Sequence, residues 1–430
     1  MSKKIPRVVI IGGGFGGLAA AKRLKRSPLK VLLIDRSNHH VLKPLLHQVA
    51  TSVLTSAQIA SPIRSLLAEQ ANASVMLGNV TRIETASKQV IVDVSDKVGL
   101  RISYDYLIVA TGATHSYFGH EEFAAFAPGL KNLSDTESLR NHILEAFEKA
   151  EIDDDPDPRR ALMTFVMVGA GPTGVEMASA IAVMARTTLR KDFRRIDPKS
   201  AHIVLAEMGS RPLANFSEEL SESARRRLLW LGVDIRLRKA VQSIDGDGVV
   251  IGDERIRAKT VVWSAGVAAS PAGKWLDCEM DRTGRVRIQR DLTIPGHTEI
   301  FVIGDTASLD QDGRPLPGVA QVAMQQGKYV AKSVFRKITG HTPLPPFCYF
   351  DKGNLAVVGK NFAILQSAGM QLSGFVAWLG WAFIHIRFLA ENSLRFSVFL
   401  QWVWTYFTGK RVARLIIRGR TNGLEHSRFH

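Results

Sequence analysis

One pattern, present twice, constrains the fold of this chain more than any other feature. The first copy is RVVIIGGGFGGLAAAKRL followed by VLLIDR, and the second is TFVMVGAGPTGVEMASAIA followed by HIVLAE. Each copy has an apolar run, a glycine-rich turn, a helical pattern, a second apolar run and an acidic residue at its end. This order is typical of a β-α-β unit with parallel strands. We therefore predict an α/β chain with two Rossmann-like domains.

The glycines of the first copy have the G-x-G-x-x-G spacing that binds a dinucleotide pyrophosphate. They are Gly12, Gly14 and Gly17, and Asp35 ends the following strand. The first glycine permits a tight turn, the second lets the backbone approach the pyrophosphate, and the third lets the helix pack against the strand. The helix N-terminus adds free N–H groups, and Asp35 would accept a hydrogen bond from a ribose hydroxyl.

The second copy predicts a second dinucleotide site. Its glycines are Gly169, Gly171 and Gly174, and Glu207 ends its second strand. Two sites in one chain imply two dinucleotides, and the simplest chemistry pairs a nicotinamide donor with a flavin acceptor. A carboxylate at Glu207 repels a 2′-phosphate, which favours NADH over NADPH, although Arg211 shortly afterwards would favour NADPH.

The intervening sequence predicts three further strands and one connector. The strands are expected at 102–113, 257–268 and 299–307, where apolar runs end in glycine turns. The polar stretch DDDPDPRR at 153–160 is expected to be a proline-broken connector between the two units.

Cysteine and histidine usage argues against metal centres. Cys278 and Cys348 form no C-x-x-C pattern, which argues against a disulfide framework, an iron–sulfur cluster or a structural zinc site and suits a reducing cytoplasm. His39, His40 and His47 cluster without completing a ligand set, so we expect them to line a cofactor pocket and predict no metal.

The net charge of +16 calls for an anionic partner, either nucleic acid or a membrane surface. From 375 the chain is apolar nearly all round until Arg387, and a second apolar run covers 396–407. A spanning helix needs about 20 apolar residues, and Arg387, Glu391 and Arg395 interrupt any longer span. We therefore predict helices that lie in the membrane interface.

Aromatic and basic residues near this end agree with that interpretation. An interfacial aromatic belt would comprise Trp378, Trp381, Trp402 and Trp404. An anionic lipid surface would be attracted by Lys410, Arg411, Arg414, Arg418 and Arg420. A packed helical hairpin or a dimer interface is the alternative. No nucleic-acid-binding fold is recognised, so we expect no nucleic-acid partner.

Further motifs carry a family resemblance. ATG at Ala110–Gly112 and GD at Gly304–Asp305 resemble the flavin-side motifs of the two-dinucleotide-binding-domain flavoproteins. Within them, the chain resembles the type II, non-proton-pumping NADH:quinone oxidoreductases over essentially its whole length. That resemblance is carried by KPLLHQVA, AQIASPIR, GAGPTGVEMA, PGVAQVAMQQGKY and FDKGNLAVVG. The stretch SNHHVLKPLLHQVA lacks the cysteine pair of disulfide reductases, which leaves a quinone or a protein as electron acceptor.

The resemblance implies a respiratory NADH dehydrogenase that uses non-covalent FAD and NADH and reduces a membrane quinone, ubiquinone or menaquinone, without proton pumping. The residues implied to bind FAD are Gly12, Gly14, Phe15, Gly16, Gly17, Asp35, His39, His40, Val80, Ala110, Thr111, Gly112, Asp305, Ala323 and Met324. Those implied to bind NADH are Gly169, Gly171, Thr173, Gly174, Glu207 and Gly266.

The resemblance also implies a catalytic residue and a quinone site. Glu176 is expected in the first turn of the helix that follows the second glycine motif. It would face the nicotinamide and flavin rings, where it would orient the nicotinamide or relay a proton. The alternative is that an acidic residue is present there only because the helix dipole favours it. Gln321 and Gln325 share a helix face and would bind the quinone carbonyl or the flavin edge. Lys352 lies either near the quinone or in a surface turn. For Asp305, ribitol binding and helix N-capping are both open.

The expected domains are 1–115 and 291–340 for FAD, 116–290 for NADH, and 341–430 for the membrane-interface helices. We expect a peripheral, monotopic protein on the cytoplasmic face of the cell membrane, and a homodimer is an open alternative. Two rival functions are a soluble NADH:acceptor flavin reductase and a non-catalytic, NADH-sensing flavoprotein.

Overall fold

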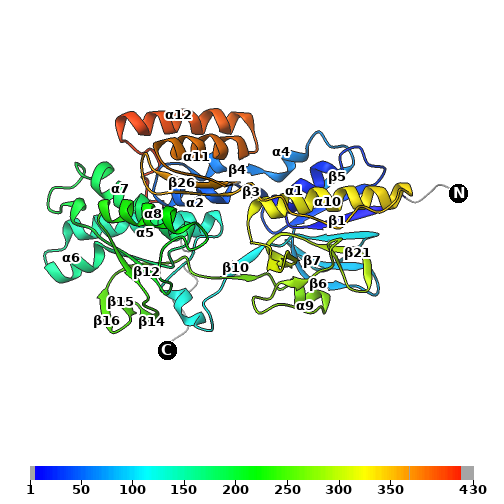
Figure 1. The fold of residues 1–430 in the computed structure, drawn as a ribbon, viewed down its shortest axis with the longest axis horizontal. Helices are drawn as coiled ribbons and strands as arrows, with labels where there is room; N and C mark the ends of the chain where they lie inside the picture. Colours follow the sequence, from blue (N-terminus) through cyan, green and yellow to red (C-terminus); the bar gives the residue numbers. More distant parts are fainter. Residues whose placement is uncertain (1–4, 368, 418–430) are drawn as a thin grey trace.

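The computed structural model describes residues 5–367 and 369–417. Figure 1 shows two lobes side by side, each built around its own sheet, with the last two helices lying along one edge of the molecule. A two-stranded ribbon, β10 (Ala113–His115) with β18 (Val267–Ala269), belongs to the connection between the lobes.

The first lobe contains a six-stranded sheet in the order β20-β21-β9-β1-β2-β5, parallel except for β20 at one edge. Side chains alternate along β1: Val8 and Ile10 pack against α1 and α10, whereas Val9 and Ile11 pack against the antiparallel sheet β6-β7-β8. Burial of both faces accounts for the uninterrupted apolar run. The bounds are β1 (Arg7–Ile11), β2 (Lys30–Asp35), β5 (Ala73–Leu77), β6 (Asn79–Glu84), β7 (Gln89–Val94), β8 (Lys97–Ser103), β9 (Tyr106–Val109), β20 (Thr293–Ile294), β21 (His297–Val302), α1 (Phe15–Arg23) and α10 (Ala320–Thr339).

The second lobe repeats this design around a parallel sheet in the order β13-β12-β11-β17. Phe165 and Met167 of β11 pack in a core shared with α5, α7 and α8, and Val166 and Val168 pack against the antiparallel sheet β14-β15-β16. The predicted α/β fold with two Rossmann-like units is confirmed. The bounds are β11 (Thr164–Val168), β12 (His202–Glu207), β13 (Val233–Leu237), β14 (Val241–Asp245), β15 (Gly248–Ile251), β16 (Glu254–Arg257), β17 (Thr260–Trp263), α5 (Leu133–Ile152), α7 (Pro172–Val183) and α8 (Glu218–Trp230).

Three expectations about single elements were wrong. The strand expected at 257–268 is divided into β17 (Thr260–Trp263) and, after a loop, β18 (Val267–Ala269). The strand expected at 102–113 is divided, because the chain leaves β8 after Ser103, turns at Asp105 and enters the parallel sheet as β9. The expected connector at 153–160 contains a short helix, α6 (Pro156–Leu162). Asp155 caps this helix, and Pro156 occupies its first position, where a fixed φ and a missing N–H favour helix formation rather than prevent it.

Shorter elements complete the lobes. Ala272, Leu276 and Val286 pack into the core beneath the first sheet, although they lie within the range 116–290 expected for the second domain. The remaining short elements are β3 (His39–Val41), β4 (Ala60–Pro62), α2 (Leu46–Ala50), α3 (Ser56–Ile59), α4 (Ile63–Leu67), α9 (Ala272–Leu276), β19 (Val286–Arg287), β22 (Ala307–Ser308), β23 (Asp310–Gln311), β24 (Arg314–Pro315), 3-10 turns η1 (Lys43–Leu45), η2 (Glu121–Ala125), η4 (Pro198–Ser200) and η5 (Gly304–Thr306), and the π turn η3 (Met184–Thr188).

The C-terminal region consists of a three-stranded antiparallel sheet followed by two helices. The strands are β25 (Asn354–Val357), β26 (Ala363–Ser367) and β27 (Met370–Gly374), and the helices are α11 (Phe375–Phe388) and α12 (Asn392–Thr408). The helices are separated at 389–391. Of the three charged residues expected to interrupt a longer span, Glu391 lies in this break, Arg387 in α11 and Arg395 in α12. Within the described part of the chain, no helix is both long and apolar enough to cross a membrane.

Several residues expected at a membrane surface lie elsewhere. Trp381 is only 2% exposed and packs in the protein core, and the indole of Trp402 donates to Gln48 Oε1 at 2.7 Å. Arg411 is buried and donates to the backbone carbonyls of Thr51 and Ala180.

The remaining members of the expected aromatic belt and basic tail agree with the expectation only in part. Trp404 is exposed and Trp378 partly so. Arg414 pairs with Asp192, so that only Lys410 of the described tail cations is exposed and unengaged in an ion pair. Arg418 and Arg420 lie outside the described residues.

Candidate active site

The first glycine turn follows β1 and has the geometry that its spacing predicts. Gly12 has φ of +103°, and a Cβ there would lie 2.3 Å from Ala110 O. A Cβ on Gly17 would lie 1.8 Å from Gly12 O, so only glycine allows α1 to approach the strand this closely. At Gly14 a Cβ would meet no protein atom within 4 Å. The second glycine therefore faces open space, as a bound pyrophosphate requires.

The three predicted flavin-side turns meet at one edge of the first sheet, because β1, β9 and β21 are adjacent parallel strands. Thr111 Oγ1 lies 2.5 Å from Ser270 Oγ and 3.2 Å from Thr306 Oγ1, and the Thr306 hydroxyl donates to Gly112 O at 3.1 Å. These contacts bind the ATG and GD motifs to each other.

The beginning of α10 covers the start of α1. A Cβ on Gly16 would lie 3.1 Å from Ala323 O, which places Ala323 and its neighbour Met324 beside the first glycine turn and the following Phe15. The resemblance grouped these residues; the structure brings them together through the close contact of the two helices.

Asp35 stabilises the first turn directly. Its Oδ2 accepts from Gly13 N at 2.6 Å, and its Oδ1 accepts from the backbone and side chain of Ser37, both at 2.7 Å. His40 forms a hydrogen bond with the same turn. Its Nδ1 lies 3.0 Å from Gly13 O and must donate to that carbonyl. Burial lowers the pKa of His40, so its ring is neutral at physiological pH.

The three clustered histidines do not converge on one point. The Nδ1 atom of His39 lies 2.8 Å from Asn38 Oδ1, that of His40 bonds Gly13 O, and that of His47 lies 3.2 Å from Glu176 Oε2. His40 lies at the first turn, whereas His47 belongs to α2, which packs against α5 and α7. Val80 is a buried residue of β6.

Asp305 lies in the 3-10 turn η5 and caps no long helix, since the N-cap of α10 is Val319. The N-cap interpretation was therefore wrong. No hydrogen bond to its carboxylate is recorded among the described residues, and its charge acts on Lys131, whose pKa is lowered by burial and by Lys43. A carboxylate with free acceptors thus lies where the first sheet ends.

Sequence reasoning missed the residue that holds the GD turn. Gly304 N donates to Gln326 Oε1 at 2.6 Å, and Gln326 is only 1% exposed. It adjoins Gln325 in the MQQG motif, but the i,i+4 pattern of Gln321 and Gln325 drew attention to the other face of the helix. A glutamine among apolar neighbours on the buried face was the available signal.

The second glycine turn has the same geometry as the first. Gly169 has φ of +98°, a Cβ on Gly174 would lie 1.9 Å from Gly169 O, and a Cβ on Gly171 would meet nothing within 4 Å. Glu207 accepts from Ala170 N and Gly209 N, both at 2.7 Å, in the manner of Asp35. Ser264, at the end of β17, donates to Gly169 O at 2.8 Å.

Arg211 does not turn toward Glu207. Its guanidinium donates to Phe216 O at 2.9 Å and to Ala214 O at 3.1 Å. Thr173 lies in the first turn of α7, and Gly266, with φ of +76°, lies against the ring of Phe118 in the loop before β18.

Glu176 lies in the second turn of α7 rather than the first, because the helix begins at Pro172. The helix-dipole explanation of this acid is therefore wrong. Its side chain is buried; Oε2 pairs with His47, and Oε1 accepts from Val357 N at 3.4 Å. One carboxylate thus joins α2, α7 and β25 of the C-terminal sheet.

Gln321 and Gln325 both lie on α10 and both contact the segment before β25. Gln325 accepts from Phe350 N at 3.0 Å and donates to Phe350 O at 2.9 Å. Gln321 donates to Gly353 O at 3.4 Å, while its buried Oε1 has no hydrogen-bond partner among the described residues. Lys352 is exposed in the same segment. Gln321 Oε1 is therefore unpaired among the described residues, whereas Gln325 Oε1 already accepts one hydrogen bond.

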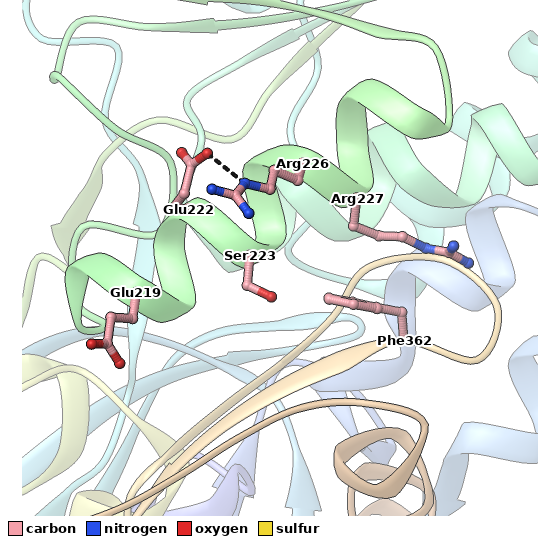
Figure 2. Close-up of a pocket in the computed structure, with 6 residues that line it drawn as sticks. All are labelled: Glu219, Glu222, Ser223, Arg226, Arg227 and Phe362. Carbon is pink, nitrogen blue, oxygen red and sulfur yellow. Dashed lines mark hydrogen bonds and ion pairs between the residues drawn. The ribbon is translucent and has the colours of Figure 1, made fainter.

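A surface hollow on α8 is a separate feature (Figure 2). Its lining residues are Glu219, Glu222, Ser223, Arg226, Arg227 and Phe362. Arg226 pairs with Glu222 at 2.9 Å. No residue of either glycine turn lines it, so its position is inconsistent with a dinucleotide site.

Comparison with known proteins places the chain among relatives of defined activity. The pyridine nucleotide-disulphide oxidoreductase family matches residues 6–327. The chain is 44% identical over 418 residues to the type II NADH:quinone oxidoreductase Ndh of Mycobacterium tuberculosis, covering 94% of this chain and 89% of that protein. It is 40% identical to the type II NADH:quinone oxidoreductase NdhA of the same organism, covering 92% and 86%. The structure of NDH2 from Plasmodium falciparum in complex with NADH has a similar fold, with a TM-score of 0.88 over 96% of this chain and 100% of that chain at 18% identity.

Proposed function

The chain belongs to the type II NADH:quinone oxidoreductases, and we infer from this that it passes two electrons from NADH, through non-covalently bound FAD, to a membrane quinone without pumping protons. The observation that carries the assignment is the pair of glycine turns whose second glycines, Gly14 and Gly171, both face open space. The soluble reductase and the NADH sensor leave the aromatic surface of the C-terminal helices unexplained.

The residues of the first lobe fit FAD. A pyrophosphate would lie against Gly14 and the N-terminus of α1, and Asp305 offers a carboxylate with free acceptors to the ribityl hydroxyls. Asp35 has acceptor capacity left for a ribose hydroxyl, since each carboxylate oxygen takes more than one hydrogen bond. FAD supplies the two-electron carrier between the two substrates. We assign 1–115 and 291–340 to FAD, with α9 and β19 adding to the same core.

The second lobe, 116–290, is assigned to NADH. Glu207 lies where the 2′-position of an adenosine ribose is bound in Rossmann units, and its negative charge disfavours a 2′-phosphate. The guanidinium of Arg211 is held by two backbone carbonyls rather than beside Glu207, which makes it a less suitable partner for that phosphate. We therefore assign the preference to NADH over NADPH.

The quinone site is assigned to α10 and the segment before β25. Gln321 supports this assignment because its buried Oε1 is a free acceptor, and an unpaired buried acceptor is costly unless a ligand donates to it. Gln325 shapes the site by fixing Phe350, and Lys352 contributes a cation at its edge. Glu176 is the catalytic group on the opposite side, where it orients the nicotinamide or relays a proton.

The C-terminal region, 341–430, is assigned to membrane binding. Large apolar side chains are exposed along α11 and α12, among them Phe383 at 72%, Phe396 at 66% and Phe407 at 80%. An exposed apolar surface of this kind marks a membrane or protein contact. We place the protein on the cytoplasmic face, peripheral to the membrane, with Lys410 toward anionic lipid. A homodimer that covers the same helices is the competing arrangement, and sedimentation with and without vesicles separates the two.

Steady-state NADH oxidation by the FAD-loaded protein tests the assignment. Rapid oxidation that depends on a short-chain quinone, with slow oxidation of NADPH, is the expected result. Oxidation that proceeds equally without quinone, or that requires a soluble protein acceptor, would contradict the proposed acceptor while leaving the two dinucleotide sites in place.

A further inference from the structure

The order of strands in the second sheet gives the direction in which a dinucleotide lies across it. Glu207 ends β12, the Gly169 turn follows β11 and Ser264 follows β17, and these three strands are neighbours in the order β12-β11-β17. In a Rossmann unit the acidic residue binds the adenosine ribose and the glycine turn binds the pyrophosphate. The half of NADH that carries the nicotinamide therefore has to continue beyond the pyrophosphate, toward the end of β17.

The loop after β17 lies directly against the second glycine turn. The Ser264 hydroxyl donates to Val168 O at 2.7 Å and to Gly169 O at 2.8 Å. A Cβ on Gly169 would lie 2.8 Å from the Cα of Ala265. The next residue, Gly266, has φ of +76°, and the chain then enters β18 in the ribbon that connects the lobes. The loop thus lies on the path from the pyrophosphate toward the first lobe.

Phe118, in the segment that follows β10, covers this loop. A Cβ on Gly266 would lie 2.4 Å from Phe118 Cζ and 3.1 Å from Ser116 O. The same carbonyl of Ser116 accepts from the indole N–H of Trp263 at 2.8 Å. The rings of Phe118 and Trp263 are 6.4 Å apart. The segment after β10 is therefore fixed to the end of β17, and it places the Phe118 ring over Gly266.

The ring of Phe118 faces solvent, although its aromatic neighbours are buried. Tyr117 is 6% and Trp263 is 5% exposed, whereas Phe118 is 67% exposed. Phe118 also has φ of +55°, a left-handed conformation that bulky side chains rarely adopt. Such backbone strain occurs preferentially at ligand sites, where the surrounding structure imposes it. Val267, directly after Gly266, is 50% exposed. Two apolar side chains thus lie beside the path of the nicotinamide half.

We propose that Phe118 binds the nicotinamide half of NADH, and that its ring is the apolar wall along which this half passes from the second lobe to the first. The inference rests on the proposed function, which assigns NADH to the second lobe. The nicotinamide is a flat ring, and aromatic rings attract one another in stacked or edge-to-face contact. Binding would also cover a phenyl ring that is exposed in the free protein, which adds a hydrophobic contribution to the affinity.

Phe118→Asn in the FAD-loaded protein tests this contact, because asparagine tolerates the left-handed conformation but has no ring. ADP-ribose is the second probe, since it shares the adenosine and the pyrophosphate with NADH but lacks the nicotinamide. The dissociation constant of NADH, taken from the concentration dependence of anaerobic flavin reduction, should rise about 3- to 10-fold. The inhibition constant of ADP-ribose should not change. Phe118→Tyr keeps the ring and should bind NADH as the wild type does.

Phe126→Asn is the matched control. Phe126 is also an exposed phenylalanine of the connection between the lobes, at 45%, but its ring lies beside Gly246 in the turn between β14 and β15. This variant should leave the constants of NADH and ADP-ribose unchanged. A loss of NADH affinity equal to that of Phe118→Asn would show that removing any exposed ring from this connection has the same effect, and would overturn the specific role of Phe118.

The remaining outcomes are equally decisive. Equal losses of NADH and ADP-ribose affinity in Phe118→Asn, or no loss, would overturn the proposal. Tighter NADH binding would also overturn it, because the ring would then block the site instead of lining it. If Phe118→Asn retains less FAD than the wild type, Phe118→Leu decides: selective weakening of NADH is expected, and unchanged affinity overturns the proposal. Flavin reduction by NADH and reoxidation by quinone in the wild type test the proposed function itself, so its failure is distinguishable from failure of the inference.

Discussion

Replacing Gly171 by alanine separates the role of this glycine in binding from any role in folding. Its φ of −70° and ψ of −178° are accessible to alanine, and the new Cβ would meet no protein atom within 4 Å. Loss of glycine flexibility stabilises by about 0.4–1 kcal/mol, and a poorer N-cap costs about as much. The free energy of unfolding should therefore change by less than about 1 kcal/mol.

The same methyl group should weaken NADH binding strongly. Overpacking against a ligand costs about 1–3 kcal/mol, which corresponds to about 5- to 150-fold in the dissociation constant of NADH. The comparison variant is Gly174→Ala, whose Cβ would lie 1.9 Å from Gly169 O and 2.6 Å from Ser264 Oγ and should lower stability directly.

The assay combines thermal unfolding of the FAD-loaded proteins with anaerobic NADH titration of the flavin spectrum. Gly171→Ala should keep its FAD and its melting temperature and lose NADH affinity. Wild-type NADH affinity in Gly171→Ala, or a loss of stability equal to that of Gly174→Ala, would refute the assigned path of the pyrophosphate.

Three further predictions concern specificity, acid stability and membrane contact. Glu207→Gln should shift the ratio of kcat/KM for NADPH over NADH upward by about 10-fold or more, and an unchanged ratio would count against Glu207 as the discriminating group. Burial would raise the pKa of Asp281, but hydrogen bonds from Thr283 and Arg285 outweigh it and lower that pKa to about 2. This depressed pKa stabilises the fold above about pH 4, and the stabilisation is lost as the pH falls toward 2. In urea unfolding, the free energy of unfolding of Asp281→Asn should therefore be about 2 kcal/mol lower than that of the wild type at pH 6, and the difference should shrink progressively below pH 4. Phe383→Glu should release the protein from anionic vesicles in sedimentation without slowing turnover of a short-chain quinone; unchanged sedimentation would point away from α11 as a membrane contact.

The sequence was most informative where local stereochemistry dictates the residue. Gly12 and Gly17 are required because any side chain would collide with the backbone of the same turn, and such requirements are visible in a motif. The alternation of Val8, Val9, Ile10 and Ile11 between two buried faces is likewise visible as an apolar run. The duplicated unit, its two glycine turns and the interruption between α11 and α12 were accordingly predicted.

Tertiary pairing was not predictable in the same way. His47 and Glu176 are far apart in the sequence, and neither residue signals the other until α2 packs on α7. Arg411 was predicted to belong to a basic tail because its charge is evident from the sequence. The two backbone carbonyls that accept its hydrogen bonds in the fold are not evident from the sequence. Trp381 was expected at the surface for a similar reason: an aromatic residue in an apolar helix suits both a membrane interface and a core.

The prediction of a short element was wrong for a third reason. Proline and aspartate in 153–160 are turn residues in most contexts, yet Asp155 as cap and Pro156 at the first helical position start a helix. Position within the element, which composition does not contain, decided the outcome.

The most direct test of the account is an anaerobic mixing experiment on the FAD-loaded protein, first with one equivalent of NADH and then with a quinone. The account predicts that NADH bleaches the oxidised flavin spectrum and that the quinone restores it with formation of one equivalent of quinol. A flavin that NADH reduces but quinone cannot reoxidise would contradict the central claim, since the electrons would then have no path to a quinone.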